Sequence, residues 1–308
     1  MDIGHDYRTR HNAAMRRFLI ILYFSCTPLL AHAWNAAGHR LSALIAWQQL
    51  SPASQEQIAK LLARHPDHER WLEKSRAESA ALIFAEAATW PDSIRHDPRY
   101  YDETREPATP PIAGLADQAR HKRWHYVDFA DNGKRRTGEI DRQIEQLSQL
   151  LRQSHDSEQL SWALPWLLHL VGDIHQPLHV GRDEDDGGNS VEIENPARRQ
   201  PFSNLHQYWD ELPGPSSLRG KRLENRADDL LARYPVPRQE SVIVWRDESH
   251  RLLGVAYPPA NGSLLPQVSE EFAQQAKTLA ERRIVAAGYR LGRLLEKIFA
   301  DRVSRETP

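Results

Sequence analysis

The chain is nearly devoid of cysteine: Cys26 is the only one among 308 residues, and it lies within the first 33. The rest of the chain can therefore form no disulfide and no zinc site built from thiolates. A strong charge of either sign is also missing, because 40 basic residues stand against 42 acidic ones, or 36 against 40 after residue 33. This balance argues against a broad basic surface, so any attraction for polyanions must be local.

Long apolar runs are missing as well. Residues 18–30 are apolar but too few to cross a bilayer as a helix, and no later stretch is a better candidate. Arg16 and Arg17 precede this run and Ala31-His32-Ala33 follows it, which is the three-part pattern of a secretory signal. We therefore expect residues 1–33 to be removed and the protein to be exported, to a periplasm or out of the cell, with Trp34 as its first residue.

Two alternatives concern this N-terminal segment. The residues before Met15 are polar and unusual for a signal, so Met15 is an alternative start. Lipoprotein processing at Cys26 is an alternative to cleavage after Ala33, but Tyr23-Phe24-Ser25 lacks the small residues that usually precede a lipoprotein cysteine.

The sequence from residue 34 to 308 is mainly helical in its pattern. Apolar residues recur at helical spacing in several segments, and a further helix should start at Ser51-Pro52. The segments are 38–50, 78–90, 138–154, 161–171 and 270–300. Residues 97–116 and 213–222 read as loops, and only 190–194 resembles a strand. No repeat or linker divides the segment, so we expect 34–308 to form one all-α domain, a multi-helix bundle.

Histidines and aspartates recur at ligand spacings. His169 and Asp173 are four residues apart among apolar neighbours, which puts both on one face of a helix, and His206 and Asp210 repeat the spacing. A buried carboxylate needs a partner, and a metal ion is a strong one. Four more candidates complete the set: His39, Asp92, His125 and His179. Imidazole and carboxylate without thiolate favour a catalytic zinc site.

The number of candidates exceeds the needs of one ion. Eight side chains and the free amino group of Trp34, which processing would create, could supply three ions with about three or four ligands each. Three carboxylates against three divalent ions leave a local positive surplus that would hold a phosphate.

Each residue also has a simpler interpretation. His169 alone could be a hydrogen-bonded core residue, and His206 with Asp210 a surface pair. Asp92 could cap a helix, and Asp128 could cap a helix or lie in a turn. These readings lose force when the two His-x-x-x-Asp pairs, Trp34 and His179 are taken together.

As a set, the strings that contain these residues are highly specific. They are Trp34-Asn35-x-x-Gly38-His39, Trp90-Pro91-Asp92-x-x-Arg95, Trp124-His125-Tyr126, His169-x-x-Gly172-Asp173-x-x-Gln176-Pro177-Leu178-His179 and Asn204-Leu205-His206-x-x-Trp209-Asp210. Through them the chain resembles the zinc-dependent single-strand nuclease and 3′-nucleotidase family, of the mung bean nuclease type, over nearly all of 34–308. The resemblance implies an all-α fold of the phospholipase C and single-strand nuclease type, with three Zn²⁺ ions.

The resemblance also implies roles for residues. One ion would take Asp92, His125, His169 and Asp173; a second would take the amine and carbonyl oxygen of Trp34, His39 and the shared Asp173; a third would take His179, His206 and Asp210. Arg95 falls where the family has a cation near the phosphate, so Arg95, Asp92 and Asp173 are the expected catalytic residues. Tyr126 and Asp128 fall where the family stacks and contacts a base. Plant and fungal members usually have disulfides, and this chain departs from them there.

The implied activity is hydrolysis of the P–O3′ bond of single-stranded DNA or RNA and of 3′-nucleotides, giving 5′-phosphates, with no stable protein partner. Zinc phospholipase C, which resembles the family in fold, is the nearest alternative. Two features favour a nuclease: His39 follows Trp34 by five residues, and the second His-x-x-x-Asp pair ends in Asp210 rather than in Glu. A non-enzymatic zinc-binding protein is another alternative. A calcium loop at Asp183-x-Asp185-x-Gly187-Gly188 is a further one, for which a polar turn is the plainer interpretation.

Overall fold

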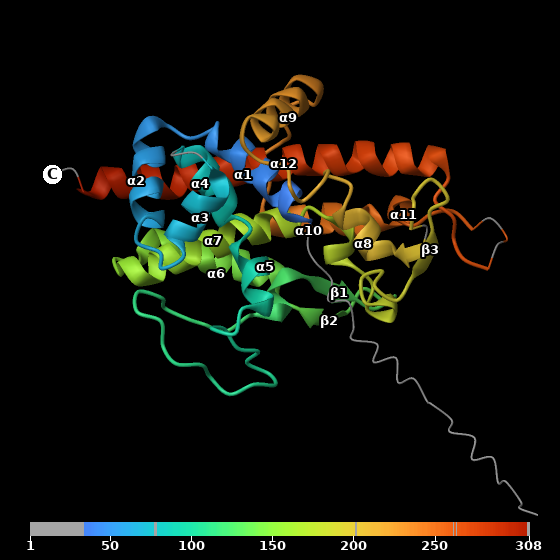
Figure 1. Ribbon diagram of the computed structural model, residues 1–308, viewed down its shortest axis with the longest axis horizontal. Coiled ribbons are helices and arrows are strands. Elements are labelled where there is room, and N and C mark those ends of the chain that lie inside the picture. Colours follow the sequence, from blue (N-terminus) through green and yellow to red (C-terminus); the bar gives the residue numbers. More distant parts are fainter. Residues whose placement is uncertain (1–33, 77–78, 201, 261, 263, 307–308) are drawn as a thin grey trace, which may run out of the picture. The chain divides into compact units, whose positions relative to one another are not determined.

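The computed structural model describes residues 34–76, 79–200, 202–260, 262 and 264–306. The expected signal segment, 1–33, lies outside the described residues. All described residues belong to one compact unit. The secondary structure is mostly helical, as predicted, with two small sheets (Figure 1).

The helices follow one another along most of the unit. In chain order they are α1 (Ala36–Trp47), α2 (Pro52–Leu62), α3 (His68–Ser75), α4 (Ala80–Ala87), α5 (Trp90–Ser93), α6 (Ile140–Gln153), α7 (Ser157–Asp173), α8 (Leu205–Asp210), α9 (Gly220–Arg233), α10 (Val242–Arg251), α11 (Leu253–Ala256) and α12 (Glu270–Glu306). Short 3-10 helices are η1 (Ile94–His96), η2 (Lys122–His125), η3 (Pro177–Val180) and η4 (Asp183–Asp185).

The helix starts have identifiable causes in the sequence. Asn35 caps α1, its side chain accepting from the amides of Ala37 and Gly38, so that the helix begins two residues after Trp34. Ser51 caps α2 and Pro52 occupies its first position, as predicted. Asn204 caps α8 in the same way. These caps fix where the histidines of α1 and α8 lie along their helices.

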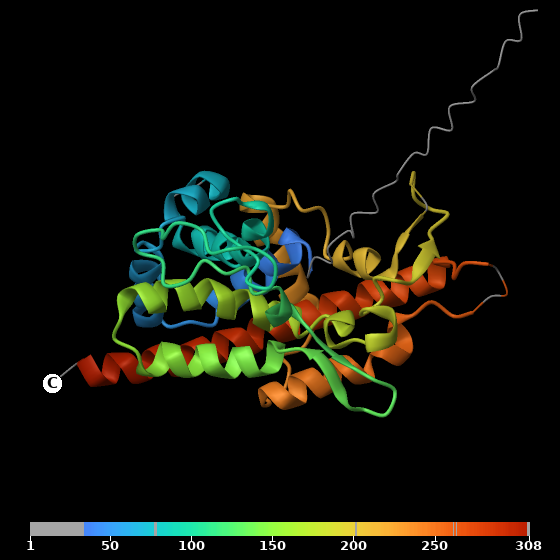
Figure 2. The ribbon, with the colours of Figure 1, turned by 90° about the horizontal axis from the view of Figure 1, so that it is seen from below.

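The long helix α12 (red in Figures 1 and 2) packs against α1, and the pair forms the largest helix contact of the fold. The axes can approach closely because Gly288 faces α1: a Cβ there would lie 2.5 Å from Cγ2 of Ile45. Helices α6 and α7 lie side by side on the same core. Residues 161–171 were predicted to be the buried central helix, and every residue of α7 from Leu160 to Asp173 is buried.

The sheets are more extensive than predicted. Strand β3 (Glu192–Glu194) lies within the expected strand 190–194 and pairs with β4 (Phe202–Asn204) in antiparallel register. The prediction that this was the only strand was wrong, because β1 (Val127–Phe129) pairs with β2 (Arg135–Gly138). Strands of three or four residues are too short to show an alternating pattern in a sequence.

Two further predictions need correction. The run 78–90 was expected to be one helix, but it is interrupted between Ala87 and Trp90, which lets α5 turn and present Asp92. The expected loop 213–222 ends earlier, since α9 begins at Gly220. Residues 97–116 carry no helix or strand, in agreement with the prediction. Over the residues that the structure describes, no helix has the length and apolar character needed to span a membrane.

Candidate metal centre

Three groups of histidine and aspartate side chains converge in the fold. Within each group the possible ligand atoms lie within 4.8 Å of one another. The groups are His39, Asp92 and His169; His125, His169 and Asp173; and His179, His206 and Asp210. All eight side chains singled out in the sequence are therefore members, and His169 belongs to two groups.

Different elements bring these residues together. His39 lies in the first turns of α1, His169 and Asp173 lie in the last two turns of α7, and Asp92 lies in α5. His125 ends η2 and His179 lies in η3, which begins at Pro177 just after α7 ends. His206 and Asp210 lie one turn apart on α8.

The first two groups form one cluster around Asp173. One carboxylate oxygen, Oδ2, lies 3.0 Å from Nδ1 of His125 and 3.2 Å from Nε2 of His169. The other, Oδ1, lies 3.3 Å from Nε2 of His39. Asp173 is fully buried and faces both sides of the cluster, which suits a carboxylate shared by two ions.

Asp92 closes this cluster from the opposite side. Its oxygens lie 3.7 Å from Nε2 of His169 and 4.0 Å from Nε2 of His39. The side chain of Asp92 is 16 % exposed, whereas those of His39, His169 and Asp173 are fully buried. The centre therefore opens to solvent at Asp92.

The third group has a geometry that requires a cation. Nδ1 of His179 lies 2.5 Å from the carbonyl oxygen of His125, and Nδ1 of His206 lies 2.7 Å from the carbonyl oxygen of Gly187. A carbonyl only accepts, so each Nδ1 carries the proton and each neutral ring presents a lone pair at Nε2. These two Nε2 atoms face each other at 3.1 Å. Two facing lone pairs repel unless a proton or a metal ion lies between them.

His169 is oriented in the same way. Its Nδ1 donates to the carbonyl of Ala88 at 2.8 Å, which leaves Nε2 free for the cluster. Metal-binding histidines typically donate their other ring nitrogen to a carbonyl or carboxylate in this manner. Oδ1 of Asp173 and both ring nitrogens of His39 are buried without a hydrogen-bond partner among the described residues. Neutral imidazole, carboxylate and orphaned acceptors together fit zinc.

The protonation states agree with this reading. Burial lowers the pKa of His39, His125 and His179 well below the usual value, so these rings are neutral at pH 7. Burial works in the same direction on His169, but the carboxylates of Asp173 and Asp92 outweigh it and raise its pKa.

The carboxyl groups respond in the opposite sense. Burial raises the pKa of Asp173 to about 6. Burial, with the nearby charges of Asp92 and Asp173, raises the pKa of Asp210 well above its usual value. Carboxylates gathered in a dry interior repel one another, and divalent cations relieve that repulsion.

Trp34 lies at the junction of the groups. Its indole is fully buried and donates to the carbonyl of Gly172, the residue before Asp173, at 3.1 Å. The next amide, that of Asn35, donates to the carbonyl of Asp210 at 3.0 Å. The backbone of residues 34 and 35 is therefore held between α7 and α8.

Arg95 and Tyr126 lie at the edge of the centre. Nη2 of Arg95 is 3.0 Å from Oδ1 of Asp92, so a buried cation stands at the solvent opening. Tyr126 follows His125, is half-buried, and its hydroxyl lies 3.4 Å from Oγ1 of Thr137.

Asp128 is buried close to the loop that carries Gly181 and Gly187. Its Oδ1 has no hydrogen-bond partner among the described residues. Burial, with the charges of Asp186, Asp183 and Asp185, raises the pKa of Asp128 to about 8. A protonated carboxyl can donate a hydrogen bond as well as accept one.

Two further residues, both within the string from His169 to His179, support the centre. Gln176 is fully buried, and its Nε2 donates to Oδ1 of Asp210 at 2.7 Å, which orients that carboxylate. Gly172 lets α1 approach α7: a Cβ there would lie 2.9 Å from Nδ1 of His39. Both residues lie inside the string from His169 to His179, which was the available signal, but only the fold reveals these contacts.

The calcium alternative is not supported by the arrangement of its residues. Both oxygens of Asp185 are engaged locally, Oδ1 by the amide of Gly188 at 2.8 Å and Oδ2 by the hydroxyl of Tyr257 at 2.7 Å. Among the described residues, the three convergent groups do not include Asp183 or Asp185. The segment is a polar turn.

Comparisons with known proteins agree on one family. The family model described as S1/P1 Nuclease matches residues 34–300. Endonuclease 1 of Arabidopsis thaliana is 26% identical over 301 residues, covering 90% of each chain. Endonuclease 4 of the same plant is 26% identical over 300 residues, 88% of this chain and 91% of its own. Nuclease S1 of Aspergillus oryzae is 22% identical over 310 residues, 87% of this chain and 93% of its own.

Proposed function

Since the chain belongs to the S1/P1 nuclease family and is thus a phosphodiester-hydrolysing nuclease, we propose that it is a zinc-dependent endonuclease and 3′-nucleotidase. Its substrates would be single-stranded DNA or RNA and 3′-nucleotides, cleaved at the P–O3′ bond to leave 5′-phosphates. The observation that supports zinc most directly is the pair of facing Nε2 atoms of His179 and His206, 3.1 Å apart.

The residues would divide among three zinc ions. His125, His169, Asp92 and Asp173 would hold one ion, and His179, His206 and Asp210 another. His39 and Asp173 would hold the remaining ion together with the amine and carbonyl oxygen of Trp34. Bound zinc supplies Lewis acidity, which makes a nucleophile available from water at neutral pH and stabilises a departing oxygen.

The protein's own groups would bind and orient the phosphate. Arg95 stands beside Asp92 at the solvent opening, where its guanidinium can donate two hydrogen bonds to phosphate oxygens and stabilise charge that builds up on them. The carboxylates of Asp92 and Asp173 contact the histidines of the cluster and orient their rings. On the sides away from this opening, the buried imidazoles keep water out of the centre.

Tyr126 and Asp128 would bind a base. An aromatic ring offers a stacking surface to any base, and the carboxyl of Asp128 can contact a base edge. A base in a duplex must first leave its stack, so single strands would be favoured.

Export would be part of the function. Removal of residues 1–33 converts the nitrogen of Trp34 from an amide, a poor ligand, into an amine. Metal binding must displace a proton from that amine, whose usual pKa is about 7.7–8.0. The buried position of Trp34 between α7 and α8 supports this role.

The test compares hydrolysis by protein that starts at Trp34 before chelation, after chelation, and after zinc is restored. We expect single-stranded DNA to be cleaved, the activity to vanish on chelation, and zinc to restore it. Phosphatidylcholine assayed in parallel should remain intact. Preferential hydrolysis of the phospholipid would support a zinc phospholipase C, and binding of zinc without any hydrolysis would support a non-enzymatic zinc protein.

A further inference from the structure

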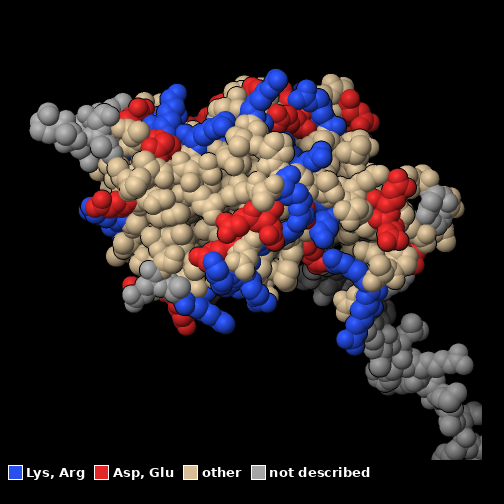
Figure 3. Space-filling model, turned by 90° about the horizontal axis from the view of Figure 1, so that it is seen from above, with Lys and Arg blue, Asp and Glu red and all other residues tan. Residues whose placement is uncertain are grey.

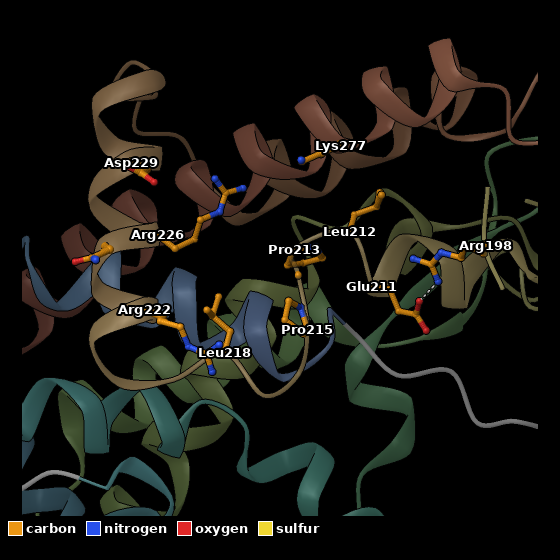
Figure 4. Close-up of a pocket in the computed structure, with 12 residues that line it drawn as sticks. Arg198, Glu211, Leu212, Pro213, Pro215, Leu218, Arg222, Arg226, Asp229 and Lys277 are labelled. Carbon is orange, nitrogen blue, oxygen red and sulfur yellow. Dashed lines mark hydrogen bonds and ion pairs between the residues drawn. The ribbon is translucent and has the colours of Figure 1, made fainter. Parts of the chain in front are cut away.

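A groove lies next to the metal centre and is not part of it. It has a volume of about 610 Å³ and is bounded by the segment Leu212–Leu218, by α9 and by α12 (Figure 4). Figure 4 shows Arg222 and Arg226 on α9 on one side of the segment that carries Pro213 and Pro215, and Lys277 on α12 at another edge of the groove. We call it the α9–α12 groove.

The groove is joined to the metal centre through the chain itself. Its wall follows directly after α8, which carries His206 and Asp210. The side chain of Asn35, the residue after Trp34, donates to the carbonyl of Gly214 in that wall at 2.7 Å. The residue that follows Trp34 therefore contacts the wall of the groove directly.

The charge of the lining departs from that of the whole chain. Four cations line the groove, namely Arg198, Arg222, Arg226 and Lys277. A second cavity of about 650 Å³ shares Arg222 and adds Arg76, Arg219 and Lys221. The two linings together hold seven cations and three acidic residues, whereas the chain has 40 and 42. Figure 3 shows both signs spread over one face without a broad field of either.

Buried carboxylates beneath the linings do not cancel this charge. Glu86 accepts from both Arg40 and Arg219, at 2.7 and 2.8 Å. Glu281 likewise accepts from both Arg226 and Arg233. Two arginines on one carboxylate leave a surplus of one positive charge in each case.

Two cations of the groove are available to a ligand. Arg222 and Lys277 are exposed, and among the described residues their charged ends have no ion-pair or hydrogen-bond partner. Arg198, in contrast, is paired with Glu211, as the dashed line in Figure 4 marks. Leu212, Pro213 and Leu218 give the groove an apolar wall against which sugars and bases can lie.

We propose that the α9–α12 groove binds the phosphodiester backbone of the nucleic-acid strand beyond the nucleotide that is cleaved, with Arg222 and Lys277 as phosphate contacts. This inference rests on the proposed function, because it takes the substrate of the metal centre to be a strand. It makes the groove a determinant of preference for long strands over 3′-nucleotides, which are too short to reach it.

The test uses the double variant Arg222→Gln/Lys277→Gln in protein that starts at Trp34 and retains its metal. For a 20-nucleotide oligo(dT) at low salt, the KM should rise roughly 5- to 10-fold. The slope of log KM against log salt should fall by about 1.4, which is 0.7 for each lost phosphate contact on a single strand. The KM and kcat for a 3′-nucleotide should stay unchanged.

The matched control is Arg64→Gln/Lys297→Gln. It removes the same charge from exposed residues, and Lys297 lies on α12 about 30 Å from Lys277. The control should behave as the unaltered protein does. An unchanged KM for oligo(dT) in the groove variant, or an equal change for both substrates or in both variants, would overturn the proposal. Failure of the proposed function would differ, because the unaltered protein would then hydrolyse neither substrate.

Discussion

The substitution Gly172→Ala tests whether the position of His39 is set by the close approach of α1 to α7. The new Cβ would lie 2.9 Å from Nδ1 and 3.3 Å from Cε1 of His39. The imidazole cannot easily withdraw, because it is fully buried and stacked on His169 with ring centroids 3.8 Å apart. One of the two rings must therefore move by several tenths of an ångström, out of the position that the proposed zinc ligation requires.

Overpacking of this kind costs about 1–3 kcal/mol, against which alanine in a helix regains about 0.5–1 kcal/mol relative to glycine. For a domain of this size each kcal/mol lowers Tm by about 2–4 °C. We expect a net fall in Tm of a few degrees, loss of about one zinc per chain, and a decrease in kcat/KM of roughly 10- to 100-fold, because small displacements of catalytic groups are costly.

The control is Gly254→Ala in α11, where nothing lies within 4 Å of the new Cβ. It should be neutral or stabilise the protein by about 0.5–1 kcal/mol. The assays are thermal denaturation, metal analysis and hydrolysis of oligo(dT). Full zinc content and full activity in Gly172→Ala would show that this contact does not position His39.

Three other predictions concern single features of the centre. Gln176→Leu removes the hydrogen bond to Asp210 and should weaken zinc binding by roughly 10- to 100-fold in competition with a chelator. The control Gln143→Leu, which breaks the hydrogen bond from Gln143 on α6 to Glu139, should leave zinc binding unchanged. The pKa of Asp128 is raised to about 8, so the folded state keeps a proton that the unfolded state loses above about pH 4. The free energy of unfolding should therefore fall as the pH rises from about 4 to 8. Asp128→Asn should make Tm less dependent on pH over that range, and an identical pH profile would contradict the assignment. Protein with Ala33 still attached to Trp34 should bind less zinc and cleave single strands much more slowly than protein that starts at Trp34, and equal activities would remove the terminal amine from the proposed ligands.

The sequence predicted several helices from their apolar period, including α6, which has no side-chain cap. Ser51-Pro52 marked the start of α2 because a serine side chain and a proline suit adjacent positions there. The predicted 270–300 matches α12, although the helix continues to Glu306. The apolar period of 78–90 continued through Ala88 and Thr89, so the break before α5 was invisible without the packing that α5 makes on α7.

The candidate centre was predictable for a different reason. His169 with Asp173 and His206 with Asp210 each share a helix face, so local geometry alone pairs them. The association of His39 with Asp173 depends on how α1 crosses α7, and no spacing in a sequence records a crossing. The same is true of the carbonyls of Ala88, His125 and Gly187, which fix the imidazole orientations from distant segments.

The most direct test of the account is metal analysis of protein that begins at Trp34, alongside the variant Asp173→Asn. Three convergent groups and a shared carboxylate predict about three zinc ions per chain, and loss of at least one zinc together with hydrolysis in the variant. A single zinc ion per chain, or a variant that keeps all its zinc, would contradict the account.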